Sequence, residues 1–264
     1  MKKEKRKIAK LIIPTIILVA VLAILVILCV GYAKKATTKI QNPIATMEVD
    51  GYGTIKIELY PDKAPNTVTN FVKLANNGFY NGLKFHRIIK DFMIQGGDSS
   101  GDGTGSAKLK DLYQNDDDTA YSILGEFNAN KYIKNDLNLT EGTIAMARAD
   151  YTQLDPRLTT QSYNSAGTQF FIMTTNDHTN LSGYYAGFGK VIEGMDVVKK
   201  IAAVKVKKAD NSEPTGSAEE STPKKDVKIK SVTVDTFGVD YGNPKTLKPF
   251  NYTDLLYSQY GISQ

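Results

Sequence analysis

The sequence predicts a mainly β domain with a closed or nearly closed sheet, preceded by one N-terminal transmembrane helix. Several short segments carry the alternating pattern of strands, whereas only two segments of the domain carry a clear helical pattern. This excess of strands argues against a parallel α/β sheet, in which strands and helices alternate. The third observation is a long uncharged stretch near the N-terminus, which has the length of a membrane span.

The first element is an apolar run over residues 11–33 that contains no charged side chain. As a helix this run would be about 34 Å long, which is enough for the roughly 30 Å hydrocarbon core of a bilayer. Residues 1–10 are rich in Lys and Arg, so the positive-inside rule keeps them in the cytoplasm and places the chain after residue 33 outside it. We therefore expect a single-pass cell-membrane protein with an extracytoplasmic domain. The alternative is secretion after signal cleavage near Ala33, but the run is longer than the usual core of about 7–15 residues.

Charge and composition narrow the functional classes. The net charge is +5, but nine of the 33 basic side chains lie in residues 1–40 with only one acidic side chain, so the rest of the chain is slightly acidic. A nucleic-acid surface needs clustered Lys and Arg on the folded domain, so we expect no nucleic-acid partner. The chain has two His residues and one Cys, which lies in the apolar run, so we expect no metal and no cofactor.

A polar spacer over residues 34–43 leads to the main domain, predicted over residues 44–236. Residues 45–49 and 54–59 form two predicted strands around an Asp-Gly turn, since apolar side chains alternate with charged ones in the second of them. Further strands are predicted at the short apolar segments 143–149, 169–174 and 227–234. A dense apolar segment also spans residues 83–97.

The first of the two predicted helices follows the strand at 54–59, and the second lies between the strands at 169–174 and 227–234. The first begins with a cap near Asn66 or Thr67 and ends at Gly78. Its apolar stripe consists of Val68, Phe71, Val72 and Ala75. The second is predicted over residues 194–203, with Met195, Val198 and Ile201 at helical spacing.

Three segments do not fit a simple strand or helix pattern. Residues 101–140 are polar and contain several Gly and Asp residues, so we expect an insertion of long loops around short strands. Residues 207–225 contain no apolar side chain larger than alanine, and we expect a mobile insertion. The tail over residues 237–264 is too rich in Phe and Tyr for a free linker, so we expect it to pack on the domain.

Four short motifs carry the chemistry of the chain. Residues 85–98 read F-H-R-I-I-K-D-F-M-I-Q-G-G-D, and residues 146–149 read M-A-R-A. Residues 164–172 then read N-S-A-G-T-Q-F-F-I, and residues 188–195 read F-G-K-V-I-E-G-M. Together these motifs resemble the signature of the cyclophilins, and the resemblance covers about residues 45–235. It implies an eight-stranded antiparallel barrel capped by two helices, with peptidyl-prolyl cis–trans isomerase activity.

Such an activity requires neither a nucleophile nor a metal. The X–Pro bond turns slowly because amide resonance must be broken, at a barrier of roughly 18–20 kcal/mol. An apolar pocket for the ring and a donor that draws the nitrogen lone pair out of resonance lower this barrier. Arg87 suits the donor role because its planar fork is always charged, although an Arg on a strand is by itself usually a surface charge.

The resemblance implies a role for each further site residue. It makes Arg87 catalytic, with Gln95 and Phe92 beside it. It assigns the proline pocket to Phe92, Met93, Phe171 and Leu181, with Tyr185 at the position of a pocket His. It assigns contacts with the residues before the proline to Ala147, Arg148 and Gln169. His86 is expected to be structural.

The expected partners are proline-containing unfolded or exported polypeptides, and the protein is expected to be a monomer. Asn180 precedes Leu181 where many eukaryotic cyclophilins have Trp, so tight cyclosporin binding is not expected. The alternative function is a catalytically weak cyclophilin-like proline-binding module or holdase chaperone. The intact set of Arg87, Phe92 and Gln95 favours the enzyme.

Overall fold

The computed structural model describes residues 18–28, 41–208 and 220–260, with no side chains for residues 258–260. The chain divides into two units, residues 1–41 and 42–264. Residues 18–28 are helical. Within the described ranges no helix is both long and apolar enough to cross a membrane. Much of the predicted 11–33 anchor lies outside the described residues, so the anchor stays a prediction.

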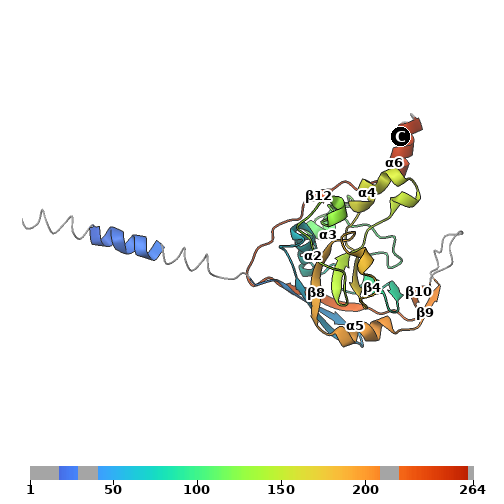
Figure 1. The fold of residues 1–264 in the computed structure, drawn as a ribbon, viewed down its shortest axis with the longest axis horizontal. Helices are drawn as coiled ribbons and strands as arrows, with labels where there is room; N and C mark the ends of the chain where they lie inside the picture. The colour runs from blue at the N-terminus through green and yellow to red at the C-terminus, as the bar shows by residue number, and fades with distance from the viewer. Residues whose placement is uncertain (1–17, 29–40, 209–219, 261–264) are drawn as a thin grey trace, which may run out of the picture. The chain divides into compact units, whose positions relative to one another are not determined.

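The domain is built on one curled, antiparallel, eight-stranded sheet that forms a half-barrel (Figure 1). Its strands are β1 (Ile44–Val49), β2 (Gly53–Leu59), β3 (Arg87–Ile89), β4 (Met93–Gly96), β6 (Thr143–Met146), β7 (Phe170–Met173), β8 (Gly187–Glu193) and β11 (Ile229–Asp235). They follow the order β11-β1-β2-β8-β6-β7-β4-β3. The predictions of a mainly β domain and of the first two strands with their turn are confirmed.

The two edge strands of this sheet, β3 and β11, are connected because the segment before β3 bonds to the start of β11 and to Val227 just before it. The backbone amides of Gly82 and Phe85 donate to the carbonyls of Ile229 and Val227 at 2.8 and 3.0 Å. The amide of Ile229 donates in turn to the carbonyl of Leu83 at 2.7 Å. These hydrogen bonds satisfy backbone groups that an open edge would leave to solvent.

Strand β8 was not predicted, because Gly187 and Gly189 lower the strand propensity of its segment. The structure gives the reason for Gly189: a Cβ there would lie 2.5 Å from the carbonyl oxygen of Glu58 on β2. Only glycine allows the two backbones to approach this closely.

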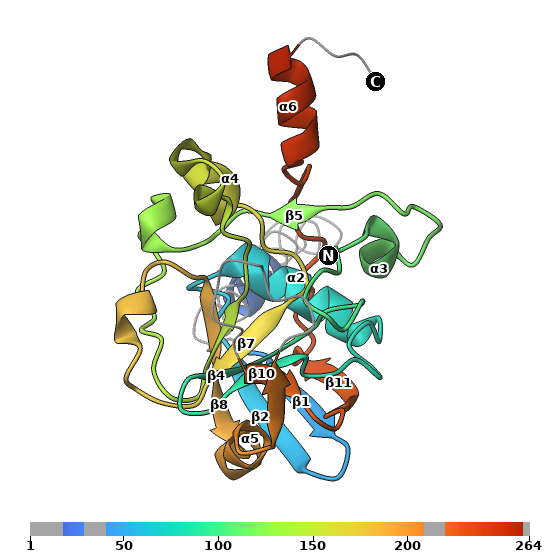
Figure 2. The same cartoon turned by 90° about the vertical axis from the view of Figure 1, so that its right-hand side faces the viewer.

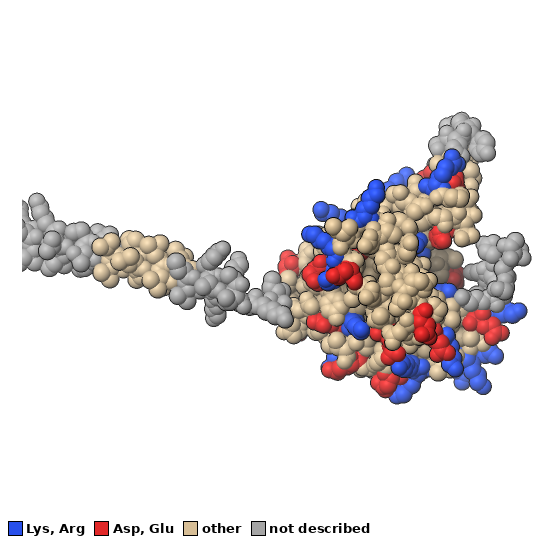
Figure 3. All heavy atoms as spheres, in the orientation of Figure 1, with Lys and Arg blue, Asp and Glu red and all other residues tan. Residues whose placement is uncertain are grey.

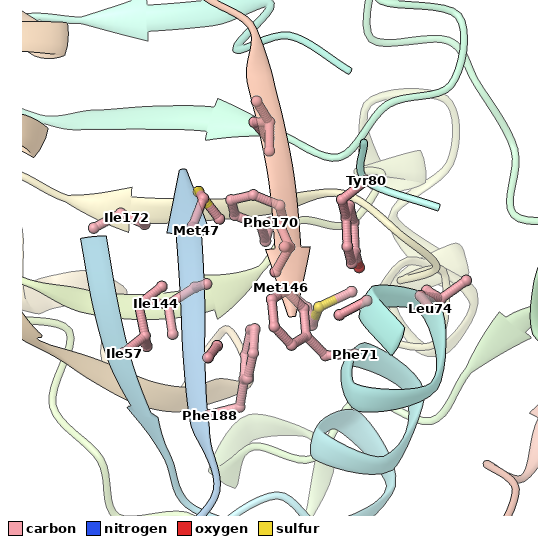
Figure 4. Close-up of a cluster of buried hydrophobic side chains, with 14 of the residues drawn as sticks. Met47, Ile57, Phe71, Leu74, Tyr80, Ile144, Met146, Phe170, Ile172 and Phe188 are labelled. Carbon is pink, nitrogen blue, oxygen red and sulfur yellow. The ribbon is translucent and has the colours of Figure 1, made fainter. Parts of the chain in front are cut away.

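Two helices cover opposite ends of the curled sheet, as Figure 2 shows. They are α2 (Pro65–Asn76) and α5 (Met195–Ala202), and both predicted helices are thereby confirmed. Their apolar faces belong to one core with the inner face of the sheet. At the centre of this core the ring of Phe71 lies 5.1 Å from that of Tyr80 and 5.2 Å from that of Phe188 (Figure 4).

The predicted cap of α2 is wrong. Neither Asn66 nor Thr67 caps the helix; it begins at Pro65, which has no N–H that would require a partner. The buried carboxylate of Glu126 accepts the amides of Asn66 and Thr67 at 3.0 and 2.8 Å, and the Thr67 hydroxyl at 2.7 Å. A carboxylate at this end satisfies free donors and interacts favourably with the helix dipole.

The insertion over residues 101–140 contains more helix than predicted. Its elements are α3 (Leu109–Tyr113), β5 (Ser122–Ile123) and η1 (Asn128–Asn130). Short helical turns also come after β6 and β7, at η2 (Tyr151–Gln153), η3 (Pro156–Leu158), α4 (Thr159–Tyr163) and η4 (Thr179–Leu181). All of these are too short to show a clear period in the sequence.

The 207–225 insertion is partly structured, contrary to the prediction. Its ends form an antiparallel pair, β9 (Val206–Lys208) and β10 (Glu220–Pro223). Residues 209–219, on which the prediction of mobility also depends, lie outside the described residues.

The aromatic tail packs on the domain up to Phe250, as predicted. Strand β12 (Thr246–Leu247) pairs with β5, and helix α6 (Tyr252–Tyr260) comes after it. The backbone of Lys245 exchanges two hydrogen bonds with the side chain of Asn66, at 2.6 and 3.0 Å.

On the face of the domain in Figure 3, acidic and basic side chains are interspersed, without the one-sign surface that nucleic acid requires.

Candidate active site

The predicted site residues gather around one open cavity of about 320 Å³. Strands β3, β4 and β7 contribute to it, together with the segment after β6 and the segment before β8. Its lining consists of Arg87, Phe92, Met93, Gln95, Ala147, Arg148, Phe171, Leu181 and Tyr185. Of the ten predicted residues, only Gln169 does not line this cavity; it lines the adjoining one and contacts Gln95.

The alternation of side chains along the strands explains why these residues share one face. On β7, Phe170 and Ile172 belong to the barrel core, whereas Phe171 and Met173 belong to a second apolar cluster. Successive strand residues point to opposite faces, so one strand supplies both the core and the cavity. Met93 on β4 lies in the same second cluster.

The strand register then aligns the central residues of the site. Arg87 on β3 pairs with Gln95 on β4, and Gln95 pairs with Phe171 on β7. Directly opposite residues on paired strands have neighbouring side chains. The structure therefore places a cation, an amide and an aromatic ring in one row across three strands.

The floor of the cavity is apolar. Met93 and Phe171 are almost fully buried, and Leu181 and Tyr185 pack against their cluster. The Phe171 and Tyr185 rings meet edge to face, with centroids 5.4 Å apart and planes at 89°. This geometry suits a pair of rings and leaves a concave apolar surface, the kind of surface that takes up a proline ring.

A chain of side-chain hydrogen bonds leads from Arg87 to a buried carboxylate. The Arg87 Nη1 donates to Gln95 Oε1 at 3.4 Å and approaches the Met93 sulfur at 3.9 Å. Gln95 Nε2 donates to Gln169 Oε1 at 3.0 Å, and Gln169 Nε2 donates to Asp98 Oδ1 at 3.2 Å. Asp98 is fully buried.

The donors and acceptors in this series of hydrogen bonds can be arranged in only one way. The Gln169 amide nitrogen faces three acceptors, the Asp98 carboxylate and the carbonyls of Gly103 and Gly105. Because none of these can donate, Gln169 must turn its oxygen towards Gln95. Gln95 then donates to that oxygen and presents its own oxygen to Arg87, as an acceptor for the guanidinium.

Replacing Gln169 by leucine should therefore lower kcat/KM by about tenfold, the effect of about one hydrogen bond to a charged group acting through Gln95. The reason is that the Gln95 amide loses the partner that fixes its orientation, so it no longer always offers oxygen to Arg87. Steady-state kinetics with an X–Pro peptide would measure the change. The matched control is Gln41→Leu, which alters an exposed glutamine of the 34–43 spacer. Unchanged kinetics in a folded Gln169→Leu variant would show that Arg87 does not depend on this series of hydrogen bonds.

The histidine next to Arg87 is not suited to acid–base chemistry. His86 precedes Arg87 but is buried, and desolvation lowers its pKa, so its ring is neutral at pH 7. Neither ring nitrogen has a hydrogen-bond partner among the described residues. Among the residues that the structure describes, there is no cluster of three or more His, Cys, Asp or Glu side chains that could bind a metal.

Arg148 stands between the two adjoining cavities and lines both of them. Its guanidinium carbon lies 4.7 Å from the ring centre of Tyr185 and 5.1 Å from that of Tyr163. Its Nε donates to the carbonyl of Tyr184 at 3.2 Å. These cation–π contacts and this hydrogen bond fix the guanidinium in place.

Two contacts at the site were not predicted from the sequence. The ring of His178, in the loop before η4, lies 4.4 Å from that of Phe92 and supports one side of the cavity. The carboxylate of Asp98 also binds the amides of Asp102 and Gly103, both at 2.9 Å. Asp98 is the last residue of the first motif. Its partners lie in the loop that follows, whose backbone turns back towards the carboxylate.

Comparisons with known proteins agree with this geometry. Residues 44–234 match the family described as cyclophilin type peptidyl-prolyl cis-trans isomerase/CLD. Peptidyl-prolyl cis-trans isomerase B of Escherichia coli strain K12 is 38% identical over 190 residues, which cover 69% of this chain and 94% of that protein. A peptidyl-prolyl cis-trans isomerase of Acinetobacter baylyi is 40% identical over 186 residues, which cover 69% of this chain and 80% of that protein.

A solved structure is similar over the same domain. It is the cyclophilin type peptidyl-prolyl cis-trans isomerase of Cryptosporidium parvum, crystallised in the presence of the dipeptide Ala-Pro. The TM-score is 0.54 at 25% sequence identity, with 73% of this chain and 98% of that chain covered. The chain therefore belongs to the cyclophilin family. Its enzymatic activity is that of a peptidyl-prolyl cis–trans isomerase.

Proposed function

We propose that this isomerase is anchored in the cell membrane and accelerates X–Pro exchange during the folding of exported proteins. Its partners are proline-containing unfolded or exported polypeptides, and it acts as a monomer without a cofactor. Its parts are a cytoplasmic segment at 1–10, an anchor at 11–33, a spacer at 34–43, the isomerase domain at 44–236 and the tail at 237–264. The eight strands work as a closed barrel, which the hydrogen bonds between its two edges support.

The observation that carries the catalytic assignment is the row of Arg87, Gln95 and Phe171 across three paired strands. In this assignment Arg87 donates to the proline nitrogen as the bond twists, and Gln95 holds the guanidinium. Met93 and Phe171 receive the ring. A hydrogen bond to the nitrogen stabilises the twisted state because the lone pair is then no longer shared with the carbonyl.

Arg87 and the apolar pocket need to remove only part of the barrier to X–Pro isomerisation. If donor and pocket together remove about 7 kcal/mol, the rate rises roughly 10⁵-fold. Phe92 lies beside Arg87, and Leu181 and Tyr185 complete the proline pocket. Ala147, Arg148 and Gln169 hold the residues before the proline.

A catalytically weak proline-binding module or holdase is the alternative. It would need the apolar cavity but not a cation aligned with the cavity floor. The position of Arg87, with Gln95 as its acceptor at 3.4 Å, favours the enzyme. Tight cyclosporin binding is not part of the proposal, since Asn180 precedes Leu181 in η4.

The uncharged run at 11–33, behind a basic segment, supports the membrane anchor. Residues 18–28, which fall inside this run, are helical and expose large apolar side chains such as Leu22 and Ile27. Unfolded chains contain about 10–30% cis X–Pro bonds, and uncatalysed exchange takes tens to hundreds of seconds. An isomerase held at the membrane would meet exported chains before they finish folding.

The location can be tested with the full chain carrying a C-terminal epitope. We expect the epitope in the membrane fraction, resistant to carbonate and accessible to protease added outside intact spheroplasts. The double variant Val21→Arg, Leu25→Arg should leave the membrane fraction, because each Arg at the centre of a span costs about 2.5–3.5 kcal/mol. The matched control is Val21→Leu, Leu25→Val. A full-length cytosolic product would contradict the anchor, and a shortened product in the medium would establish cleavage and secretion instead.

A further inference from the structure

A second cavity, of about 340 Å³, adjoins the candidate active site. The two cavities share Gln95, Ala147 and Arg148 in their linings. A polypeptide bound with its proline in the first cavity would therefore extend over or into the second. Because Ala147 and Arg148 hold the residues before the proline in the proposed site, those residues would occupy the second cavity.

One wall of this cavity comes from outside the cyclophilin domain. Pro249 and Phe250 line it, whereas the match to the family ends at residue 234. The ring of Phe250 lies 5.0 Å from that of Tyr151 in η2, with the planes at 59°. Both rings are half-buried. The tail thus adds a second ring beside Tyr151 from beyond the residues that match the family.

The tail is fixed where it meets the cavity. Strand β12 ends two residues before Pro249 and pairs with β5, whose Ser122 itself lines the cavity. The hydrogen bonds between Lys245 and Asn66 hold the segment just ahead of β12. The position of Phe250 is therefore set by paired backbone and does not depend on its own side-chain contacts alone.

The rest of the lining consists mostly of small residues and of uncharged Ser, Thr and Gln side chains, and it leaves room for a large uncharged side chain. Several lining residues are small, namely Gly103, Gly105, Ala107, Ala149 and Gly167. Among the described residues of the lining only Arg148 is charged, and its guanidinium already lies over aromatic rings and bonds to backbone carbonyls. A planar apolar group between the small residues and the Tyr151–Phe250 pair would gain offset or edge contacts with both rings.

We infer that the C-terminal tail is part of the substrate site: Phe250, with Tyr151, selects substrates that carry an aromatic side chain shortly before the proline. This inference rests on the proposed catalytic site only for the direction in which the polypeptide lies. It makes Phe250 a specificity-determining residue that contacts substrate without acting on the reacting bond.

The test uses the full chain in detergent and peptides that differ only before the proline. The second residue before the proline is Phe or Ala in one pair, and the residue immediately before it is Phe or Ala in another. For at least one pair, we expect kcat/KM for the Phe peptide to exceed that for the Ala peptide by roughly fivefold, the value of one aromatic contact. Phe250→Ala should abolish that preference, lowering kcat/KM for the Phe peptide by much more than for the Ala peptide.

Three further variants make the result decisive. Tyr151→Ala should also abolish the preference, and Phe250→Tyr should restore it, because a ring remains in the wall. Tyr257→Ala, which removes an exposed aromatic side chain of α6 that does not line the cavity, should keep the preference. An unchanged preference in folded Phe250→Ala, or an equal loss for both peptides, would overturn the inference.

Binding measured by calorimetry separates this inference from the catalytic assignment. Tighter binding of the Phe peptide that is lost in Phe250→Ala supports the role of the tail even if turnover is slow. Normal turnover without any preference in binding or kinetics overturns the role of the tail and leaves the catalytic assignment intact.

Discussion

The Arg87→Ala variant should retain the fold and lose about 100- to 1000-fold in kcat/KM for an X–Pro peptide. This magnitude corresponds to the removal of one aligned donor that acts mainly in the transition state, about 2.7–4 kcal/mol. The ground-state peptide bond has little negative charge on its nitrogen, so the guanidinium gains most when the bond is twisted. Hence kcat should fall more than peptide affinity.

Arg87→Lys separates charge from geometry. Lysine keeps the positive charge but replaces a planar fork with a single ammonium. It therefore cannot donate to both Gln95 and the twisted bond with the geometry of arginine. We expect it to recover only a small part of the lost activity. Exchange measured by NMR between the cis and trans forms of the peptide gives these rates directly.

The matched control is Arg157→Ala, which removes an exposed arginine that pairs with Asp155, two residues before it. Its kinetics should equal those of the wild type. If folded Arg87→Ala isomerises the peptide within a factor of three of the wild type, the donor role of Arg87 is wrong. If the folded wild type itself gives no acceleration, a proline-binding module describes the chain better.

The centre of the site was predictable because its residues are local in sequence. Arg87 and Gln95 face each other across a tight hairpin, in which Asp91 adopts a left-handed conformation at φ 57°. Their separation along the chain therefore fixes their pairing. The period of two then places Met93 and Gln95 on the same face of β4. Phe171 joins them through a motif whose spacing the family resemblance supplied.

The surroundings of the site were not predictable for the opposite reason. His178, Glu126 and Phe250 reach their positions through loops and a tail whose paths no short pattern specifies. Phe250 in particular depends on the pairing of two-residue strands, too short to show any alternation. Sequence patterns predict contacts within and between regular helices and strands. The contacts of His178, Glu126 and Phe250 depend instead on the paths of the loops and the tail.

The stability of the domain also depends on such a connection, because Glu126 lies in the 101–140 insertion and should stabilise α2 strongly. Glu126 is 2% exposed and accepts three hydrogen bonds from the first turn of α2. Alanine would take this partner from the half-buried amide of Asn66 and from the buried amide and hydroxyl of Thr67, at the positive end of the helix dipole. Each unsatisfied group costs about 1–3 kcal/mol, so we expect a total loss of about 3 kcal/mol after relaxation.

This loss should lower Tm by about 6–12 °C for a domain of this size. Glu126→Gln should lie between the wild type and Glu126→Ala, because its one oxygen can still accept from one side of the turn. The matched control is Glu193→Ala, which breaks an exposed ion pair with Lys56 at 2.8 Å and should cost less than about 1 kcal/mol. Urea unfolding followed by circular dichroism measures all three variants. Equal stabilities for Glu126→Ala and Glu193→Ala would mean that water or a shifted backbone satisfies the helix end, and that the insertion carrying Glu126 does not stabilise α2.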